Sequence, residues 1–104
     1  MSLTRDESKA SFAIIRHNIR TYESGGVAAV IKGRDNAKLE VERFEAGQSS
    51  EDRHAGWRYF LEKTHLKAGM NPEEATHIRQ MDLEIRESQA QTLPDRFSNP
   101  LRHN

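Results

Sequence analysis

Two pairs of glutamate and histidine are the residues of this sequence whose types and spacing best fit metal chemistry. In each pair a glutamate stands three residues before a histidine, and the pairs are Glu51 with His54 and Glu74 with His77. On a helix this spacing brings both side chains to one face, as in the helices of di-iron carboxylate bundles. Both pairs also fall in expected first turns, where glutamate complements the helix dipole without any metal. A metal-binding helical protein is therefore one alternative, and we expect no cofactor.

Histidine and serine side chains also raise the question of acid–base or nucleophilic catalysis. The five histidines are His17, His54, His65, His77 and His103. A catalytic base must reach the proton it removes, and a serine nucleophile needs such a base beside it. No glycine-rich phosphate loop, nucleophile elbow or paired-carboxylate motif accompanies any of these residues. The sequence identifies no catalytic residue and favours a protein without catalytic activity.

A nucleic-acid-binding regulator is another alternative, favoured by two features. Residues 51–90 contain two expected helices joined through Gly69, which is typical of a helix-turn-helix. Against it, Glu73 and Glu74 at the start of the second helix would repel phosphates, and His65 stands where a small residue is needed. The other feature is a basic turn after residue 31. The candidate contacts from both features are Lys32, Arg34, Lys38 and Arg79.

Aromatic residues are crowded into residues 57–60, and they favour a protein interface. On the helix expected here, Tyr59 lies about 200° around the axis from Trp57, so the aromatic side chains do not all face one core. Exposed aromatic residues mark interfaces more often than cofactor sites. In the following helix, Leu83 points away from the apolar stripe, which consists of Ala75, Ile78, Met81 or Asp82, and Ile85. The predicted homodimer interface consists of Trp57, Tyr59, Phe60 and Leu83.

The composition predicts one small domain with a thin core. Leu, Ile, Val and Phe make up 20 of the 104 residues, and 16 Lys and Arg balance 16 Asp and Glu. So few apolar residues are typical of disordered chains, but those also carry a high net charge. A folded domain that buries apolar surface against a second copy fits better. The zero net charge provides no global positive field for nucleic acid, which is therefore not the expected partner.

Cysteine content and apolar runs bear on the compartment. The sequence contains no cysteine, which excludes disulfides and thiolate metal sites. No apolar run approaches the roughly 18–20 residues of a membrane helix, and the first six residues lack the apolar core of a signal peptide. We therefore expect a cytoplasmic protein that does not bind a membrane.

The beginning of the chain predicts a helix over residues 7–22. Apolar residues recur there at steps of three or four, the pattern of one helix face. The stripe consists of Phe12, Ile15, Ile19 and Tyr22. Two glycines then end the element. A strand over residues 12–15 is a minor alternative.

Two apolar runs, residues 27–31 and 38–44, then predict a β-hairpin over residues 27–44. The second run alternates apolar and polar residues, as a half-buried strand does. Gly, Asp and Asn between the runs supply turn chemistry. A helix over residues 27–31 is the alternative, because Ala28 and Ala29 suit one.

The second half of the chain predicts two helices with marked ends. The first follows a serine cap at Ser49 or Ser50 and includes the aromatic residues up to residue 61. The second begins with Asn71 as cap and Pro72 at the first helical position, and it ends near Gln91. These helices form the predicted antiparallel helical hairpin.

The predicted fold is α+β, with an N-terminal helix, a β-hairpin and the helical hairpin in one domain over residues 1–91. An all-α bundle is the alternative. Residues 1–6 are expected to fray, and residues 92–104, which contain Pro94 and Pro100, are expected to be a mobile tail. The predicted function is that of a self-associating interaction or accessory protein, in which a homodimer and a further protein partner are the expected associations.

Overall fold

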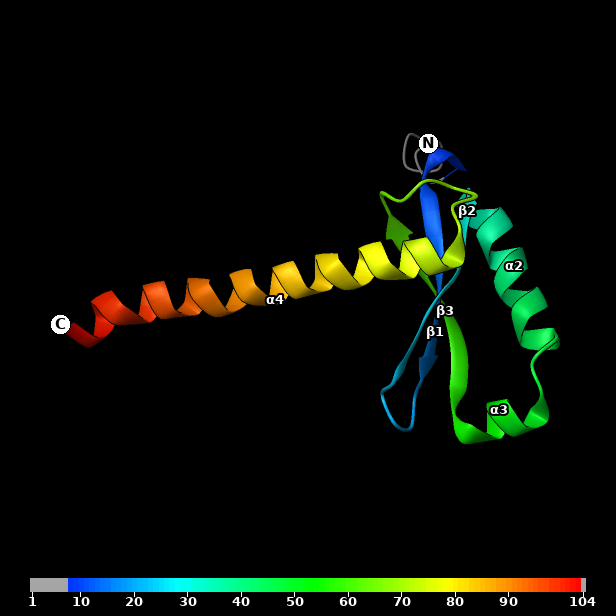
Figure 1. The fold of residues 1–104 in the computed structure, drawn as a ribbon, viewed down its shortest axis with the longest axis horizontal. Helices are drawn as coiled ribbons and strands as arrows, with labels where there is room; N and C mark the ends of the chain where they lie inside the picture. Colours follow the sequence, from blue (N-terminus) through cyan, green and yellow to red (C-terminus); the bar gives the residue numbers. More distant parts are fainter. Residues whose placement is uncertain (1–7, 104) are drawn as a thin grey trace.

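The computed structural model describes residues 8–103, with side chains up to Gln89. Its elements are β1 (Ser11–Asn18), β2 (Ser24–Lys32), α2 (Arg34–Ala46), α3 (Ser50–Ala55), β3 (Trp57–Thr64) and α4 (Pro72–His103). The strands form one antiparallel sheet in the order β2-β1-β3. Figure 1 shows α4 crossing the sheet and projecting beyond it, with α2 alongside the sheet. The α+β class is confirmed and the all-α alternative is wrong, and the described part contains strands where the N-terminal helix is predicted.

β1 is the central strand, and helices cover both of its faces. Ala13 and Ile15 belong to the buried cluster that Ala75 of α4 completes. Ile14 points to the opposite face, where α2 contacts β1, and is fully buried. A strand covered on both faces needs consecutive apolar residues, and residues 12–15 supply them. The helix predicted over residues 7–22 is therefore wrong, and the alternative strand over residues 12–15 is confirmed. The periodicity does not separate the two, because a short apolar run fits the pattern of a helix as well as that of a strand.

A β-hairpin is present, but it pairs β2 with β1. Residues 27–31 form a strand as predicted, so the helical alternative for that run is wrong. Residues 38–44 lie in α2, so the second strand of the predicted hairpin is wrong. This segment alternates like a strand, yet it also places Ala37, Val41 and Phe44 at helical spacing. The helix prevails because it brings Ala37, which is fully buried, against the sheet.

Asn18 holds the turn between β1 and β2 from a buried position. It is 3% exposed, and its Oδ1 accepts hydrogen bonds from the backbone N–H groups of Arg20 (2.9 Å) and Thr21 (3.0 Å). The Ile19 N–H donates to the Gly56 carbonyl over 2.8 Å, which joins this turn to the start of β3. Gly56 has φ +110°, and a Cβ added to it would lie 2.6 Å from Asn18 Oδ1. This corner of the fold therefore requires glycine at position 56.

α3 starts as predicted but ends before the aromatic residues. The Ser49 hydroxyl caps it by accepting a hydrogen bond from the Asp52 N–H over 3.0 Å. Gly56, in the left-handed conformation, ends the helix, and residues 57–64 form β3. The helix predicted through residue 61 is wrong because its aromatic residues favour a strand. With β3 between α3 and α4, the predicted antiparallel helical hairpin is wrong too.

α4 begins as predicted and is anchored to β2. Asn71 Oδ1 accepts a hydrogen bond from the Glu73 N–H over 2.8 Å, and Pro72 occupies the first helical position. One turn later, the Thr76 hydroxyl accepts a hydrogen bond from the Val27 N–H over 2.8 Å. Because these contacts involve only the first turns, the remainder of α4 leaves the sheet.

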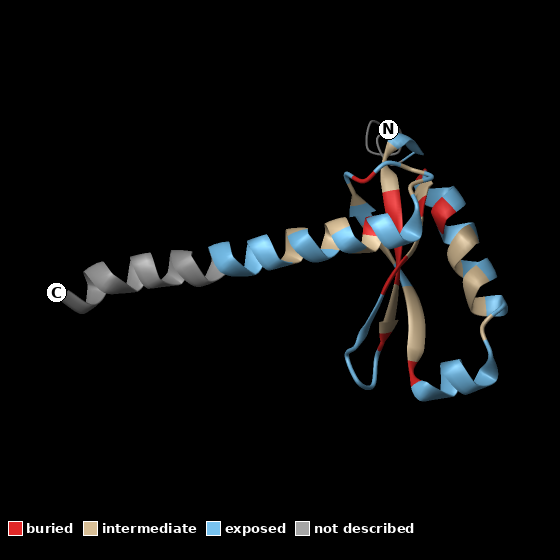
Figure 2. Cartoon of the chain, in the orientation of Figure 1, coloured by how far each residue is buried: buried red, intermediate tan, exposed pale blue. Residues whose placement is uncertain are grey.

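The projecting part of α4 gives the molecule its extended shape. The helix has 32 residues, which corresponds to about 48 Å. The radius of gyration is 17.5 Å, compared with about 13 Å for a compact domain of this length. The predicted helix end at Gln91 is wrong, and Pro94 and Pro100 lie within α4; that residues 92–104 are mobile stays a prediction. In Figure 2 the buried residues lie in the sheet and at the start of α4 and α2.

Candidate functional site

The sheet face that carries α4 is covered over only part of its length. Phe60 lies opposite Ile15 in the β1–β3 register and therefore on this face, yet it is 45% exposed. The His17 ring is 6.4 Å from the Phe60 ring and 6.4 Å from the Tyr22 ring. Tyr22, in the hairpin turn, is 78% exposed. We call His17, Tyr22 and Phe60 the aromatic row.

α4 carries two large apolar side chains that are exposed. Met81 is 48% exposed and Ile85 is 53% exposed. Each lies about 200° around the helix from Leu83, which lines a hollow with His65 and Leu66 after the end of β3. Met81 and Ile85 therefore face away from that connection. The aromatic row, Met81 and Ile85 together form what we call the apolar corner.

The residues of the predicted homodimer interface do not share one surface. Trp57 and Tyr59 lie on the face of β3 opposite to Phe60. There the Arg16 guanidinium carbon lies 3.9 Å from the centroid of the Trp57 ring. Phe44 of α2 stacks on Tyr59 with 5.1 Å between ring centroids. Phe60 belongs to the apolar corner, whereas Leu83 lies on another side of α4.

The apolar corner contains three residues that the sequence assigns elsewhere. Tyr22 belongs to the stripe of the predicted first helix, and Met81 and Ile85 to the core stripe of the predicted helical hairpin. The stripe on α4 is real, since Ala75 is buried and Ile78 packs on the core cluster. The stripe continues beyond the residue at which α4 leaves the sheet. Helical periodicity in the sequence does not indicate where a helix stops contacting its neighbour.

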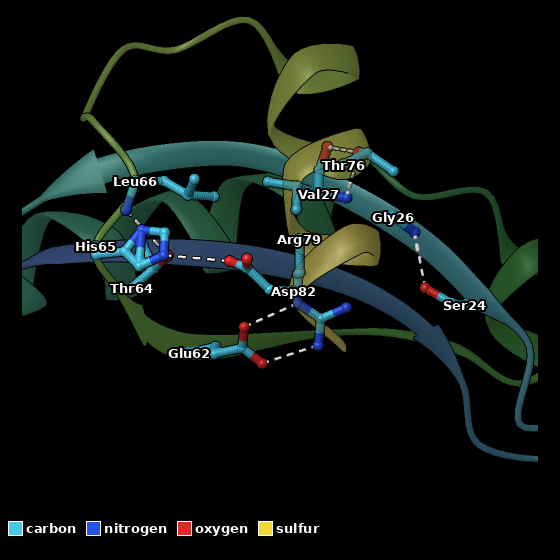
Figure 3. A network of polar contacts seen from close by, with 10 residues as sticks. All are labelled: Ser24, Gly26, Val27, Glu62, Thr64, His65, Leu66, Thr76, Arg79 and Asp82. Carbon is cyan, nitrogen blue, oxygen red and sulfur yellow. Dashed lines mark hydrogen bonds and ion pairs between the residues drawn. The ribbon is translucent and has the colours of Figure 1, made fainter. Parts of the chain in front are cut away.

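A group of polar side chains, separate from the apolar corner, joins α4 to β3, as Figure 3 shows. Arg79 donates two hydrogen bonds to the Glu62 carboxylate, from Nε to Oε2 over 2.8 Å and from Nη2 to Oε1 over 2.9 Å. These bonds lower the pKa of Glu62 although burial opposes the shift, and they raise the pKa of Arg79. The Arg79 side chain is 20% exposed and that of Glu62 is 42% exposed. Arg79 is thus engaged in holding α4 to the sheet.

We expect Glu62→Gln to lower the free energy of unfolding by about 1 kcal/mol at pH 7, because it breaks a half-exposed bidentate ion pair. The lowered pKa of Glu62 means that the unfolded chain binds a proton more readily than the folded one. The pair therefore contributes fully above the ordinary carboxyl pKa of 4.5 and is lost as the pH falls through the lowered folded value. Urea unfolding of both proteins between pH 7 and pH 3 should show the difference shrinking at the acid end.

Glu40→Gln is the matched control for this measurement. Glu40 pairs with Arg43 at i,i+3 on the surface of α2, with 2.8 Å between the atoms, and such pairs contribute about 0.3 kcal/mol. A Glu62→Gln deficit that stays constant down to pH 3, or that equals the Glu40→Gln deficit, would contradict the assigned role of the Glu62–Arg79 pair.

His65 ties the connection after β3 to α4. Its Nε2 lies 3.2 Å from Oδ2 of Asp82, and Figure 3 shows both side chains between the end of β3 and the helix. Asp82 lines a hollow of about 210 Å³ together with Glu62 and Arg79. His65 also borders a second hollow on its other side. His65 therefore lines two hollows, and no catalytic residue is identified here.

The predicted nucleic-acid contacts lie on different parts of the molecule. Lys32 ends β2, whereas Arg34 and Lys38 lie in α2, and all three are exposed. The basic turn predicted here is the start of α2, which follows Gly33 directly. Arg79 is bound to Glu62. Because β3 separates α3 from α4, residues 51–90 do not form a helix-turn-helix.

The two predicted metal-ligand pairs are not brought together. Glu51 and His54 lie in α3, and Glu74 and His77 lie in the first turns of α4. All four are exposed, and Figure 1 shows the two elements well apart. Within residues 8–103, the structure contains no group of three or more His, Asp or Glu residues that could hold a metal ion.

No protein-family model matches this chain, and comparisons with curated proteins and with solved structures found no match. Among the described residues, no helix has the length and apolar content needed to cross a membrane. The surfaces described above are therefore the basis for a proposed function.

Proposed function

We propose that this chain is a non-enzymatic interaction protein that forms a homodimer through the apolar corner. The observation that carries the proposal is the exposure of large apolar and aromatic side chains in the hairpin turn, on β3 and on α4. Tyr22, Phe60, Met81 and Ile85 are each between 45% and 78% exposed. Burying apolar surface contributes about 25 cal/mol per Å², so covering this corner would stabilise a domain whose own core is small.

A second copy is the occupant that fits the corner best. The first turns of α4 already cover half of the sheet face through Ala75 and Ile78. The projecting part of a partner's α4 can cover the open half in the same way, and two-fold symmetry makes both corners equivalent. An isolated helix has little stability in water, so the projecting part gains a supporting surface. The zero net charge means that two copies do not repel each other.

The test is the mass of the protein in solution, measured by light scattering after size exclusion. At about 50 μM, well above a Kd of about 1 μM, we expect the wild type at twice the 12.0 kDa chain mass, which is 24.0 kDa. The variant Met81→Asp, Ile85→Asp should elute at the chain mass of 12.0 kDa, because two carboxylates in the apolar corner would lose their hydration in the dimer. Phe60→Asp, which places a carboxylate on the sheet side of the apolar corner, should also shift the protein towards the monomer mass.

Leu39→Asp is the matched control. Leu39 lies on α2 and is 53% exposed, as Ile85 is, but it is outside the apolar corner, so this variant should remain dimeric. Circular dichroism should show that the monomeric variants keep their secondary structure. A monomeric wild type at this concentration, or dissociation by Leu39→Asp as complete as by the corner variants, would overturn the proposal.

A further inference from the structure

Three of the chain's five lysines line one shallow hollow at the end of the sheet opposite to the hairpin turn. They are Lys9, Lys32 and Lys67, and the hollow has a volume of about 520 Å³. Ser11 and His65 also line it, and none of the described residues that line it is acidic. We call this set of lysines the lysine cluster.

The fold brings the lysine cluster together from three separate segments. Lys9 precedes β1, Lys32 ends β2, and Lys67 lies in the connection between β3 and α4. Ser11 and Lys32 are partners in the β1–β2 register. The Gly69 N–H donates to the Val30 carbonyl over 2.9 Å, which holds the connection against the end of β2. The three lysines are therefore brought together by backbone contacts of the fold, and these contacts do not depend on the lysine side chains.

Among the residues that the structure describes, no acidic side chain lines the hollow to neutralise these charges. All three lysines are exposed, and the ion pairs seen among the described side chains join other residues. Asp82, which contacts His65, lines the neighbouring hollow and not this one. Like charges held close together destabilise the folded chain, and a bound anion relieves their repulsion.

We propose that the lysine cluster binds a compact, multiply charged phosphate anion, such as the oligophosphate group of a nucleotide. Lysine binds phosphate oxygens as a point charge, and the Ser11 hydroxyl and the His65 ring offer further hydrogen bonds. The hollow is shallow and open to solvent, which suits a charged anion better than an apolar ligand.

An extended polyanion fits this position less well than a compact one. Asp35 follows Lys32 in the first turn of α2, and Glu73 and Glu74 follow Lys67 in the first turn of α4. A long phosphate backbone crossing the lysine cluster would pass these carboxylates and be repelled by them. Lys32 is thus the candidate nucleic-acid contact that also belongs to the lysine cluster, whereas Lys9 and Lys67 come from other segments of the chain.

The experiment is isothermal titration calorimetry with sodium tripolyphosphate at low ionic strength. We expect saturable binding to the wild type that weakens as salt is added, because the contacts are exposed. The variant Lys32→Gln, Lys67→Gln should bind about tenfold more weakly, since two charge-assisted hydrogen bonds are lost. Lys38→Gln removes an exposed lysine of α2 outside the hollow and should change the affinity less than twofold. Thermal unfolding without ligand serves to show that all variants fold.

Two further ligands test whether the lysine cluster prefers a compact, multiply charged anion. Inorganic phosphate should bind more weakly than tripolyphosphate, and a short DNA duplex should not compete for the lysine cluster. Absence of saturable tripolyphosphate binding up to about 1 mM, or equal losses in the Lys38→Gln and double variants, overturns the proposal. Tighter binding of the duplex that depends on Lys32 and Lys67 overturns the assignment to a compact anion. The lysine cluster lies away from the apolar corner, so the result is independent of the dimer measurement.

Discussion

Ile14→Ala is expected to lower the free energy of unfolding by about 3–4 kcal/mol, the middle of the range of roughly 2–5 kcal/mol for truncating a buried isoleucine. Ile14 is fully buried in the central strand, opposite Ala29 of β2 and Leu61 of β3. Removing three carbon atoms there loses their transfer free energy and leaves a cavity that the sheet backbone cannot close. In a domain of ordinary stability, this loss is a large fraction of the total.

Urea unfolding followed by circular dichroism measures this loss. Protein concentration must be the same for all samples, because dimerisation would make the apparent stability depend on it. Ile19→Ala is the control: it removes the same atoms from a side chain that is 45% exposed, and it should cost less than about 1 kcal/mol. Similar losses for both variants would mean that Ile14 does not sit in the core as described.

Gly56→Ala is expected to destabilise the protein by about 3 kcal/mol through two effects. The first is conformational, because Gly56 has φ +110°, a region that alanine adopts only with strain. The second is steric, because the new Cβ would lie 2.6 Å from Asn18 Oδ1 and 2.8 Å from Arg20 Cγ. Arg20 can move, but Asn18 is buried and bound to the turn, so the clash is relieved only by breaking the corner.

Gly69→Ala separates the two effects. Gly69 has φ +86°, yet a Cβ there would meet nothing within 4 Å, so this variant carries the conformational cost alone, about 1 kcal/mol. The difference between the two variants, from thermal or urea unfolding, measures the clash with Asn18. If Gly69→Ala costs as much as Gly56→Ala, the corner is not as tightly packed as described.

Features encoded by neighbouring residues could be predicted from the sequence. The caps at Ser49 and Asn71 depend on a side chain two or three residues from the amides that it binds, and both predictions are confirmed. The strand at residues 27–31 is confirmed too. In contrast, residues 12–15 and 38–44 each carry the periodicity of both a helix and a strand. The choice between helix and strand depends on the element against which each segment packs, and that element is distant in the sequence.

The candidate sites depend still more on distant contacts. Arg79 was a predicted nucleic-acid contact, but Glu62, seventeen residues away, binds it. The lysine cluster joins Lys9, Lys32 and Lys67, which no local pattern connects. Phe60 is one of the aromatic residues of the predicted interface, and it is exposed. The predicted helix over residues 57–61 groups it with Tyr59, which lies on the other face of the sheet.

The hydrogen bonds of the two outer strands affect how the protein resists aggregation. The N–H of Val27 in β2 is bound by the Thr76 hydroxyl. In β3, the Tyr59 N–H donates to Glu45 Oε2 over 3.5 Å, and Gln48 Nε2 donates to the Trp57 carbonyl over 2.9 Å. Side chains of helices and loops thus occupy backbone groups that would otherwise pair with a strand of another molecule. These contacts obstruct the pairing of a further strand with β2 at Val27 and with the start of β3, and growth of the sheet into fibrils is hindered at these positions.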